Sequence, residues 1–251
     1  MQHPVNLRVF FISPKKLNMK KILFICVAAF SLLTGYSQGN NSNAQTRNVS
    51  GFTGVDVSGG IDLYLSNGPE SVSVSASTSE VRDHIVTEVV HGVLRIHLQD
   101  KWNSGWGNSK MKAYVSISKL KSLEASGGGD IFLKGLITAD DLSVGLSGGG
   151  NMEGKINADL LSIGQSGGSS VNLSGKVRDL NLQSSGGGNL KGYDLITDNV
   201  TINSSGGSDA ELTVNKEIRV ESSGGSSVSY KGKAVVRSVN SSGGGSVTHK
   251  D

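Results

Sequence analysis

The stretch SGGGDIFLKGLITADDLSVGLSGGGNMEGKINADLLSIGQSGG, residues 126–168, contains three Ser-Gly-Gly copies separated by two runs of alternating apolar and polar residues. The tripeptide recurs through the second half of the chain at intervals of 18 to 21 residues. The copies begin at Ser126, Ser147, Ser166, Ser185, Ser205, Ser223 and Ser242, and an outlying copy begins at Ser58. Repeats of this length and regularity are typical of solenoids.

One repeat unit has too few apolar residues to fold alone. The unit that follows Ser166, for example, offers Val171, Leu173, Val177, Leu180 and Leu182. Burying five such side chains contributes about 10 kcal/mol, whereas ordering a unit of this length costs more, at about 1 to 2 kcal/mol per residue. The sequence therefore predicts an all-β, parallel β-helix-like solenoid over residues 120–251, in which each coil of 18–21 residues stacks on the next. We expect three short sides per coil and a rise of about 4.8 Å.

The glycine pairs mark a corner that recurs in every coil. A residue there needs a positive φ and no side chain that would contact the neighbouring coils, and glycine meets both demands. We expect both glycines of each pair to be structural turn residues. They are Gly59, Gly60, Gly127, Gly128, Gly148, Gly149, Gly167, Gly168, Gly186, Gly187, Gly206, Gly207, Gly224, Gly225, Gly243 and Gly244.

Short polar residues recur four positions after the serine of each copy. We predict that they form a ladder whose side chains bond to the neighbouring backbone. The ladder consists of Asp62, Asp130, Asn151, Ser170, Asn189, Asp209, Ser227 and Ser246.

Residues 48–119 form an N-terminal β module with a hairpin, because four segments there alternate apolar and polar residues with a period of two. The segment 78–90 allows two readings. Val81, Ile85 and Val89 have helical spacing, with Ser79 as a cap, but the β-branched content equally fits a strand. We favour a short turn at 79–83 followed by a strand that enters a hairpin at Gly92.

Residues 1–37 resemble a signal peptide. They hold five of the 24 basic residues and no acidic one, and an apolar run at 22–35 is too short to span a bilayer comfortably. Met19 is the expected true start, and Cys26, the only cysteine, lies in the apolar run. An uncleaved anchor is the alternative. We expect a flexible linker at 38–47, and no membrane span once the signal peptide is removed.

The sequence beyond residue 37 has 19 basic and 21 acidic residues, so it lacks the positive charge that nucleic-acid binding requires. We therefore expect no nucleic-acid partner. We expect an exported protein of the periplasm, the outer-membrane surface or the secreted fraction.

Several segments together resemble the family called putative auto-transporter adhesin, head GIN domain, of exported Bacteroidetes proteins. They are FTGVDVSGGIDLYLSNG at 52–68, SVSVSAS at 71–77, GVLRIHL at 92–98, the serial Ser-Gly-Gly turns and the final SSGGGSV at 241–247. Gly60-Ile61-Asp62 stands at the Gly-Ile-Asn for which the family is named, with Asp in place of Asn. The resemblance covers residues 48–249. It implies a right-handed β-helix-like fold and an envelope or secreted location, and it carries over no catalytic residues.

Catalytic and metal-binding readings find little support in the sequence. Polysaccharide-active β-helices need paired carboxylates within about 5 to 10 Å, and Asp130 and Asp209 are four coils apart in the predicted ladder. Asp62 reaches Asp130 only if the outlying copy docks there. The histidines at 84, 91 and 97 are too far apart along strands to share a metal ion. We expect no enzyme, no metal and no cofactor.

The segment KWNSGWGNSK, residues 101–110, is the surface candidate for recognition. Trp102 and Trp106 offer apolar faces beside the amides of Asn103 and Asn108, a mixture that suits a sugar ring or a protein partner. The alternative is that both tryptophans cap the open end of the solenoid. We predict an adhesin-like binding module for a glycan or an envelope protein. The alternatives are a polysaccharide-active enzyme and a structural periplasmic spacer.

Overall fold

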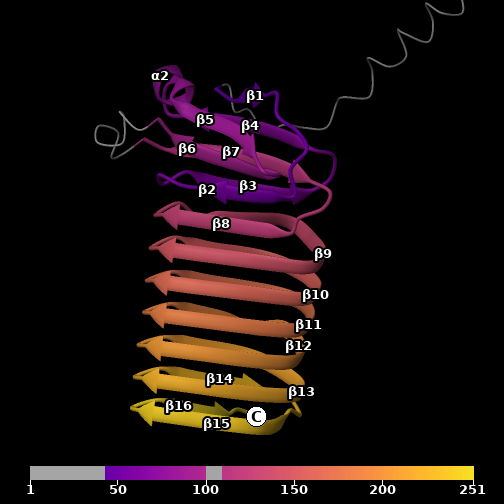
Figure 1. Cartoon of the computed structure of the whole chain (residues 1–251), viewed down its shortest axis with the longest axis vertical. Coiled ribbons are helices and arrows are strands. Elements are labelled where there is room, and N and C mark those ends of the chain that lie inside the picture. Colours follow the sequence, from indigo (N-terminus) through magenta and orange to yellow (C-terminus); the bar gives the residue numbers. More distant parts are fainter. Residues whose placement is uncertain (1–42, 100–108) are drawn as a thin grey trace, which may run out of the picture. The chain divides into compact units, whose positions relative to one another are not determined.

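The computed structural model describes residues 43–99 and 109–251, which belong to one compact unit that spans Ser42–Asp251. About three quarters of this region (74%) is β-strand and only 2% is helix, and the strands wind into a solenoid of about seven turns (Figure 1). The predicted all-β solenoid is therefore confirmed. Within the same residues, no helix is long and apolar enough to cross a membrane.

Five long strands, each bent along its length, make the middle coils of the solenoid. They are β9 (Ile131–Gly148), β10 (Asn151–Gly167), β11 (Ser170–Gly186), β12 (Asn189–Gly206) and β13 (Asp209–Gly224). Each pairs in parallel with the next, so that equivalent residues of successive units stack in register. Leu161, Leu180, Val200 and Ile218 form one such column, and all four are buried. Stacking thus supplies both the hydrogen-bond partners and the apolar contacts that one unit lacks.

Each coil has two limbs, which we name by their position relative to the Ser-Gly-Gly turn. In β11 the outgoing limb, after the turn, buries Val171 and Leu173, and the incoming limb, before the next turn, buries Leu180 and Leu182. Val177 is buried between the limbs, where a wide bend joins them. The inward groups are those that the sequence pattern indicated.

The outlying Ser-Gly-Gly copy is a full member of the stack. It joins β2 (Gly54–Val57) to β3 (Asp62–Asn67). β2 pairs in parallel with β8 (Ser122–Gly127), and β3 pairs in parallel with β9. The predicted N-terminal module at 48–119 is therefore continuous with the solenoid.

The chain does not stack its first coils in sequence order. β6 (Val93–Leu98) pairs with β2, and β7 (Met111–Ile117) pairs with β3, on the side away from β8 and β9. The β2–β3 coil consequently lies between the β6–β7 coil on one side and β8 and β9 on the other, and all of these strands follow it in the sequence.

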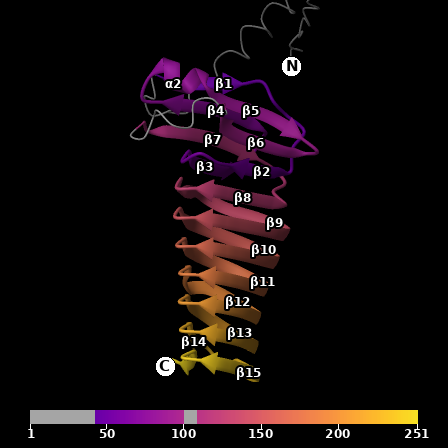
Figure 2. The ribbon, with the colours of Figure 1, turned by 60° about the vertical axis from the view of Figure 1, so that its left-hand side comes forward.

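Antiparallel strands close the N-terminal end of the solenoid (Figure 2). β4 (Ser71–Ala76) pairs with β7, β1 (Gln45–Arg47) pairs with β4, and β5 (Ile85–Val90) pairs with β6. Residues 45–47, the last three of the predicted linker at 38–47, form β1 instead, and the Arg47 guanidinium donates to the backbone oxygens of Arg82 and Ile85. Residues 78–90 divide between a one-turn helix, where we favoured a turn, and the strand that we expected, and Ser79 is not the cap. The helix is α2 (Ser79–Asp83), and its cap is Thr78, whose Oγ1 accepts from the Val81 backbone N–H.

The C-terminal end has an open core. Its strands are β14 (Ser227–Lys231), β15 (Val235–Gly243) and β16 (Ser246–His249). Val236 and Val239 occupy the inward positions that Ile218 and Val220 fill in the preceding coil. They are 45% and 42% exposed, whereas Ile218 and Val220 are fully buried, because no described residue covers them.

Candidate functional site

The Ser-Gly-Gly turns form one straight edge of the solenoid. In the repeats, the first glycine of each pair has a positive φ, from 78° to 106°. A Cβ on Gly186, for instance, would lie 2.9 Å from the Gly167 backbone oxygen. On Gly187 it would meet nothing closer than that same oxygen, at 3.9 Å, and its φ lies outside the left-handed region. We expected both glycines of a pair to need a positive φ and the absence of a side chain, but in the repeats only the first does. Gly59 and Gly60 are the exception, since both have a positive φ.

Buried polar side chains fill the inside of this edge. Ser204 Oγ bonds to Ser208 Oγ, and Ser222 Oγ bonds to Ser226 Oγ. In an earlier coil, Gln165 Nε2 bonds instead to Ser169 Oγ at 3.3 Å and reaches the Asn189 backbone oxygen at 3.3 Å. These bonds tie the two limbs together just inside the turn.

Gly188 has a local explanation in the same edge. A Cβ there would meet Ser184 Oγ at 3.1 Å and the Gln165 Cβ at 3.2 Å, so the long Gln165 side chain takes the space that a serine fills in later coils. Ser184 Oγ, which has no hydroxyl at 188 to bond, is buried without a hydrogen-bond partner among the described residues. Gln165, which stands where later coils have serine, thus leaves room only for a glycine at position 188 in the next coil.

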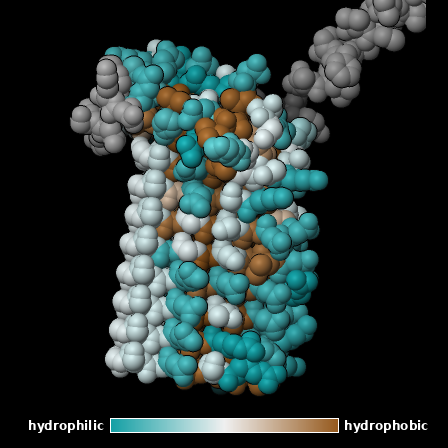
Figure 3. Space-filling model, in the orientation of Figure 1, coloured by the Kyte–Doolittle hydropathy of each residue, from teal (hydrophilic) through white to brown (hydrophobic). Residues whose placement is uncertain are grey.

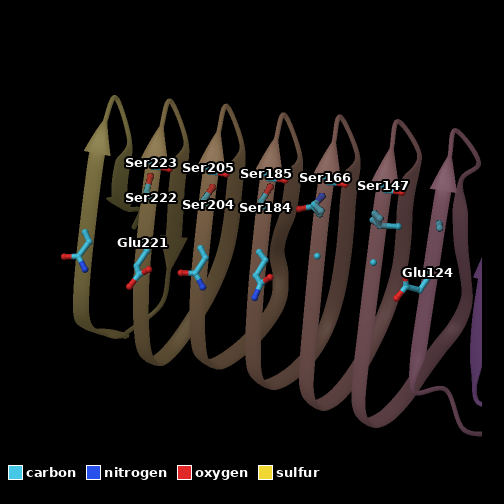
Figure 4. Close-up of a pocket in the computed structure, with 18 of the residues that line it drawn as sticks. Glu124, Ser147, Ser166, Ser184, Ser185, Ser204, Ser205, Glu221, Ser222 and Ser223 are labelled. Atoms are coloured by element: carbon cyan, nitrogen blue, oxygen red, sulfur yellow. The ribbon is translucent and has the colours of Figure 1, made fainter.

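The outer face of the incoming limb is a groove of about 1390 Å³ that extends over seven coils (Figure 4). Two rows of exposed residues line it, each with one member per coil, and between them lies a third, mostly buried residue of each coil, such as Leu146 or Ser184. The serine row is the first residue of each turn, namely Ser126, Ser147, Ser166, Ser185, Ser205, Ser223 and Ser242. The floor row lies two residues earlier and consists of Glu124, Gly145, Gly164, Gln183, Asn203, Glu221 and Asn240, with Asp56 beyond Glu124.

Both rows follow from strand geometry. Residues two apart on a strand point to the same face, and parallel in-register pairing repeats each position at the strand spacing of about 4.8 Å. In Figure 3 a pale column of intermediate hydropathy follows the left edge of the solenoid, where Figure 1 places the turns. The groove is therefore as periodic as the sequence repeat.

The groove offers hydroxyls, amides and three carboxylates, those of Asp56, Glu124 and Glu221. Its described lining contains no lysine, arginine or histidine. Such a surface suits ligands that donate and accept many hydrogen bonds, and it disfavours anionic ones.

The predicted polar ladder runs along the outgoing limb. Asp62 Oδ1 accepts from the Asp130 backbone N–H at 3.1 Å, and Asp130 Oδ1 accepts from the Asn151 backbone N–H at 2.9 Å. Asp62 and Asp130 are thus brought together, as the docking of the outlying copy required. Their hydrogen bonds link successive coils in the way expected of a structural ladder.

Three aromatic rings stack on the outer face of the same limb. Tyr64 lies between Tyr114 and Phe132, with ring centroids 5.1 Å and 4.8 Å apart. Lys112 and Lys134 hold their ammonium groups over the Tyr64 ring. Sequence analysis missed this stack, although Tyr64 and Phe132 share a signal, since each follows the serine of its Ser-Gly-Gly copy by six residues.

Residues 101–108 of the tryptophan segment lie outside the described residues, and so do residues 1–37. Trp102, Asn103, Trp106 and Asn108 thus remain predictions from the sequence. Of the histidines considered for metal binding, His84 Nδ1 lies 3.1 Å from Gln99 Oε1, and His97 Nε2 lies 3.7 Å from Glu88 Oε1. In residues 43–99 and 109–251, no three His, Cys, Asp or Glu side chains gather closely enough to hold a metal ion.

Comparison with known proteins gives one family and several similar folds. The family model described as putative auto-transporter adhesin, head GIN domain, matches residues 51–234. The crystal structure of a putative adhesin from Bacteroides fragilis NCTC 9343 is 20% identical, with a TM-score of 0.71, over 82% of this chain and 96% of that one. A putative adhesin from Parabacteroides distasonis ATCC 8503 is 18% identical, with a TM-score of 0.63, over 82% and 96%.

A third similar structure has a different description. It is a putative lipid binding protein, also from Parabacteroides distasonis ATCC 8503, and is 20% identical, with a TM-score of 0.62, over 84% of this chain and 98% of that one. At these identities the likenesses show the fold alone. No curated protein matches the chain significantly.

Proposed function

The chain belongs to the putative auto-transporter adhesin, head GIN domain family, and we propose that it is a non-enzymatic binding protein of the cell envelope or surface. Its ligand is an uncharged, extended glycan that lies in the groove along the solenoid axis. The location outside the cytoplasm is supported by the signal-like residues 1–37 and by the family's description as an adhesin.

The regular spacing of the groove carries the proposal. Every coil adds one serine hydroxyl and one floor residue at about 4.8 Å from the last. This step is close to the length that each sugar adds to an extended β-1,4-linked chain. A glycan along the axis therefore meets a serine hydroxyl at each successive sugar. Many weak contacts of this kind add up over a polymer, because each further contact is intramolecular once the first has formed.

The charge of the groove selects among polymers. Its three carboxylates, without a cation in the described lining, oppose uronic-acid chains, phosphate-bearing polymers and nucleic acids. The lipid-binding description of one similar protein has little counterpart in this groove, since most of its described lining is polar and its apolar side chains are those of Ala125, Leu146 and Val239.

A polysaccharide-active enzyme is the second candidate, because Asp56 and Glu124 are register neighbours at one end of the groove. Paired carboxylates are what glycoside hydrolysis needs. Glu221, by contrast, lies five coils from Glu124, or about 24 Å at the strand spacing. The descriptions of the family and of the similar structures as adhesins favour binding.

Titration calorimetry with cellohexaose and chitohexaose tests the function. We expect the protein to bind at least one of these neutral hexasaccharides and not polygalacturonate, and to release no reducing ends from either. The variant Gln183→Ala/Asn203→Ala should weaken binding at least tenfold, since it removes two adjacent amides from the floor row. Binding of neither hexasaccharide by the parent protein would show that the proposal is wrong, and released reducing ends would favour the enzyme.

The control is Asn172→Ala/Lys191→Ala. These two exposed residues are register neighbours on the outgoing limb, away from the groove. The control should bind like the parent protein. Equal losses in the two double variants would mean that the groove is not the site.

A further inference from the structure

Two glycines of the floor row lie inside strands rather than in turns. Gly145 and Gly164 are in the incoming limbs of β9 and β10 and are register neighbours. Neither has a φ in the left-handed region. Over these two coils the floor therefore has no side chain of its own; the backbone is exposed at Gly164, and the end of the Glu124 side chain lies over Gly145.

Packing does not explain these glycines. A Cβ on Gly164 would meet nothing closer than the Val144 backbone oxygen at 3.9 Å, an ordinary contact. On Gly145 it would meet the end of the flexible Glu124 side chain, with Oε2 at 3.1 Å. By contrast, a Cβ on Gly148, in the turn that follows Gly145, would lie 2.2 Å from the Gly127 backbone oxygen.

Glycine in a strand has a cost. It loses more conformational freedom on folding than any other residue, so it destabilises a strand relative to alanine. Where no turn or bulge requires it, glycine in a strand marks a place where a ligand or another backbone approaches closely. Here the open side of both glycines is the groove.

The groups around these two glycines are arranged to hold a sugar. Glu124 lies one coil beyond Gly145, and Gln183 lies one coil beyond Gly164, on the opposite side. These two hydrogen-bonding groups are three coils apart, about 14 Å. Ser147 and Ser166 line the same coils along one side.

We propose that Gly145 and Gly164 form a subsite for two consecutive rings of a neutral β-1,4-linked glycan. The proposal rests on the proposed function of the groove and identifies the part of it that determines specificity. The ring faces pack on the backbone at Gly164 and, once the flexible Glu124 side chain turns aside, at Gly145. Glu124 then accepts hydrogen bonds from the sugar hydroxyls at one end, and the Gln183 amide binds at the other. A β-branched side chain at either glycine would fill the space that the rings occupy.

The test replaces Gly164 by threonine and measures both stability and binding of the hexasaccharide that the parent protein prefers, cellohexaose or chitohexaose. We expect the melting temperature to stay the same or rise, because threonine suits a strand better than glycine. We expect the Kd to rise at least tenfold. Gly164→Ala should keep the stability and weaken binding less, and Ser143→Thr, which alters β9 outside the groove lining, should bind like the parent protein.

The other results separate this subsite from the groove as a whole. If Gly164→Thr binds like the parent protein while Gln183→Ala/Asn203→Ala does not, the subsite is wrong and the function stands. A fall in the melting temperature of both Gly164 variants would show a structural role for this glycine and overturn the proposal. Parent protein that binds neither hexasaccharide contradicts both proposals.

Discussion

Single glycines of this chain have three different reasons for being glycine. The first glycine of a repeat turn has a positive φ and lies against the backbone of the preceding coil. Gly188 is small because Gln165 and Ser184 crowd it. Gly145 and Gly164 have no such neighbour in the backbone and border the groove instead. Only the first reason is visible in the sequence as a regular repeat.

The two glycines of one turn should differ in their response to the same substitution. Gly186→Ala should lower the free energy of unfolding by roughly 1 to 3 kcal/mol, because it forces a left-handed φ and a clash with the Gly167 backbone. Gly187→Ala should change it by less than about 0.5 kcal/mol. Chemical denaturation of both variants decides the matter, and equal losses would refute this distinction within the turn.

At the scale of elements, the wide bends are joined by charged groups at the surface. Arg178 lies between Asp159 and Asp179, at 3.6 Å and 2.9 Å, and Asn199 Nδ2 donates to Asp179 Oδ1 at 2.7 Å. The hydrogen bond from Asn199, followed by that from Arg178, lowers the pKa of Asp179 below its ordinary value. Three successive bends are thereby linked by polar and charged side chains, and Asp179 is the group among them whose pKa folding lowers.

Acid should loosen these bends. Because the pKa of Asp179 is lower in the folded state, its stabilising effect is present in full above the ordinary aspartate pKa and disappears as the pH falls through the folded value. The effect is small, since the group is partly exposed. Melting temperatures between pH 5 and pH 2 should fall slightly less steeply in Asp179→Asn than in the parent protein. A steeper fall in the variant would contradict the role given to Asp179.

At the scale of the whole solenoid, the two ends differ. The N-terminal end is closed by antiparallel strands over a buried core, whereas every residue of β15 at the C-terminal end is exposed. In a stack where each coil contacts only its neighbours, stability falls toward an uncovered end.

Hydrogen exchange should therefore begin at the C-terminal coil. We expect amides of β15 and β16 to exchange much faster than those of β10 to β12, and amides of β2 and β3 to be as protected as the middle coils. Mass spectrometry of exchanged peptides measures this order directly. Faster exchange in β2 and β3 than in β15 would mean that the N-terminal strands do not cap the stack.

The sequence alone determined the solenoid, its coil length, the turn edge and the polar ladder. These features are local, or they repeat at a constant interval, so that the partner of each residue can be read one period away. The break at 79–83 and the strand after it were also within reach, because they depend on neighbouring residues, although the break is a helical turn rather than the turn that we favoured.

Only the tertiary structure decided how the first coils stack, where the aromatic rings meet and which face is grooved. The β2–β3 coil pairs with strands that come later in the chain, and no period in the sequence indicates that order. The stack of Tyr64, Tyr114 and Phe132 depends on the same long-range register. In the sequence, nothing distinguishes Gly145 and Gly164 from the many other glycines. Their position in the groove becomes visible only in the folded backbone. Pairing between distant segments depends on the apolar surface that all coils bury together. No single stretch of the sequence determines that buried surface, so only the folded molecule shows the pairing.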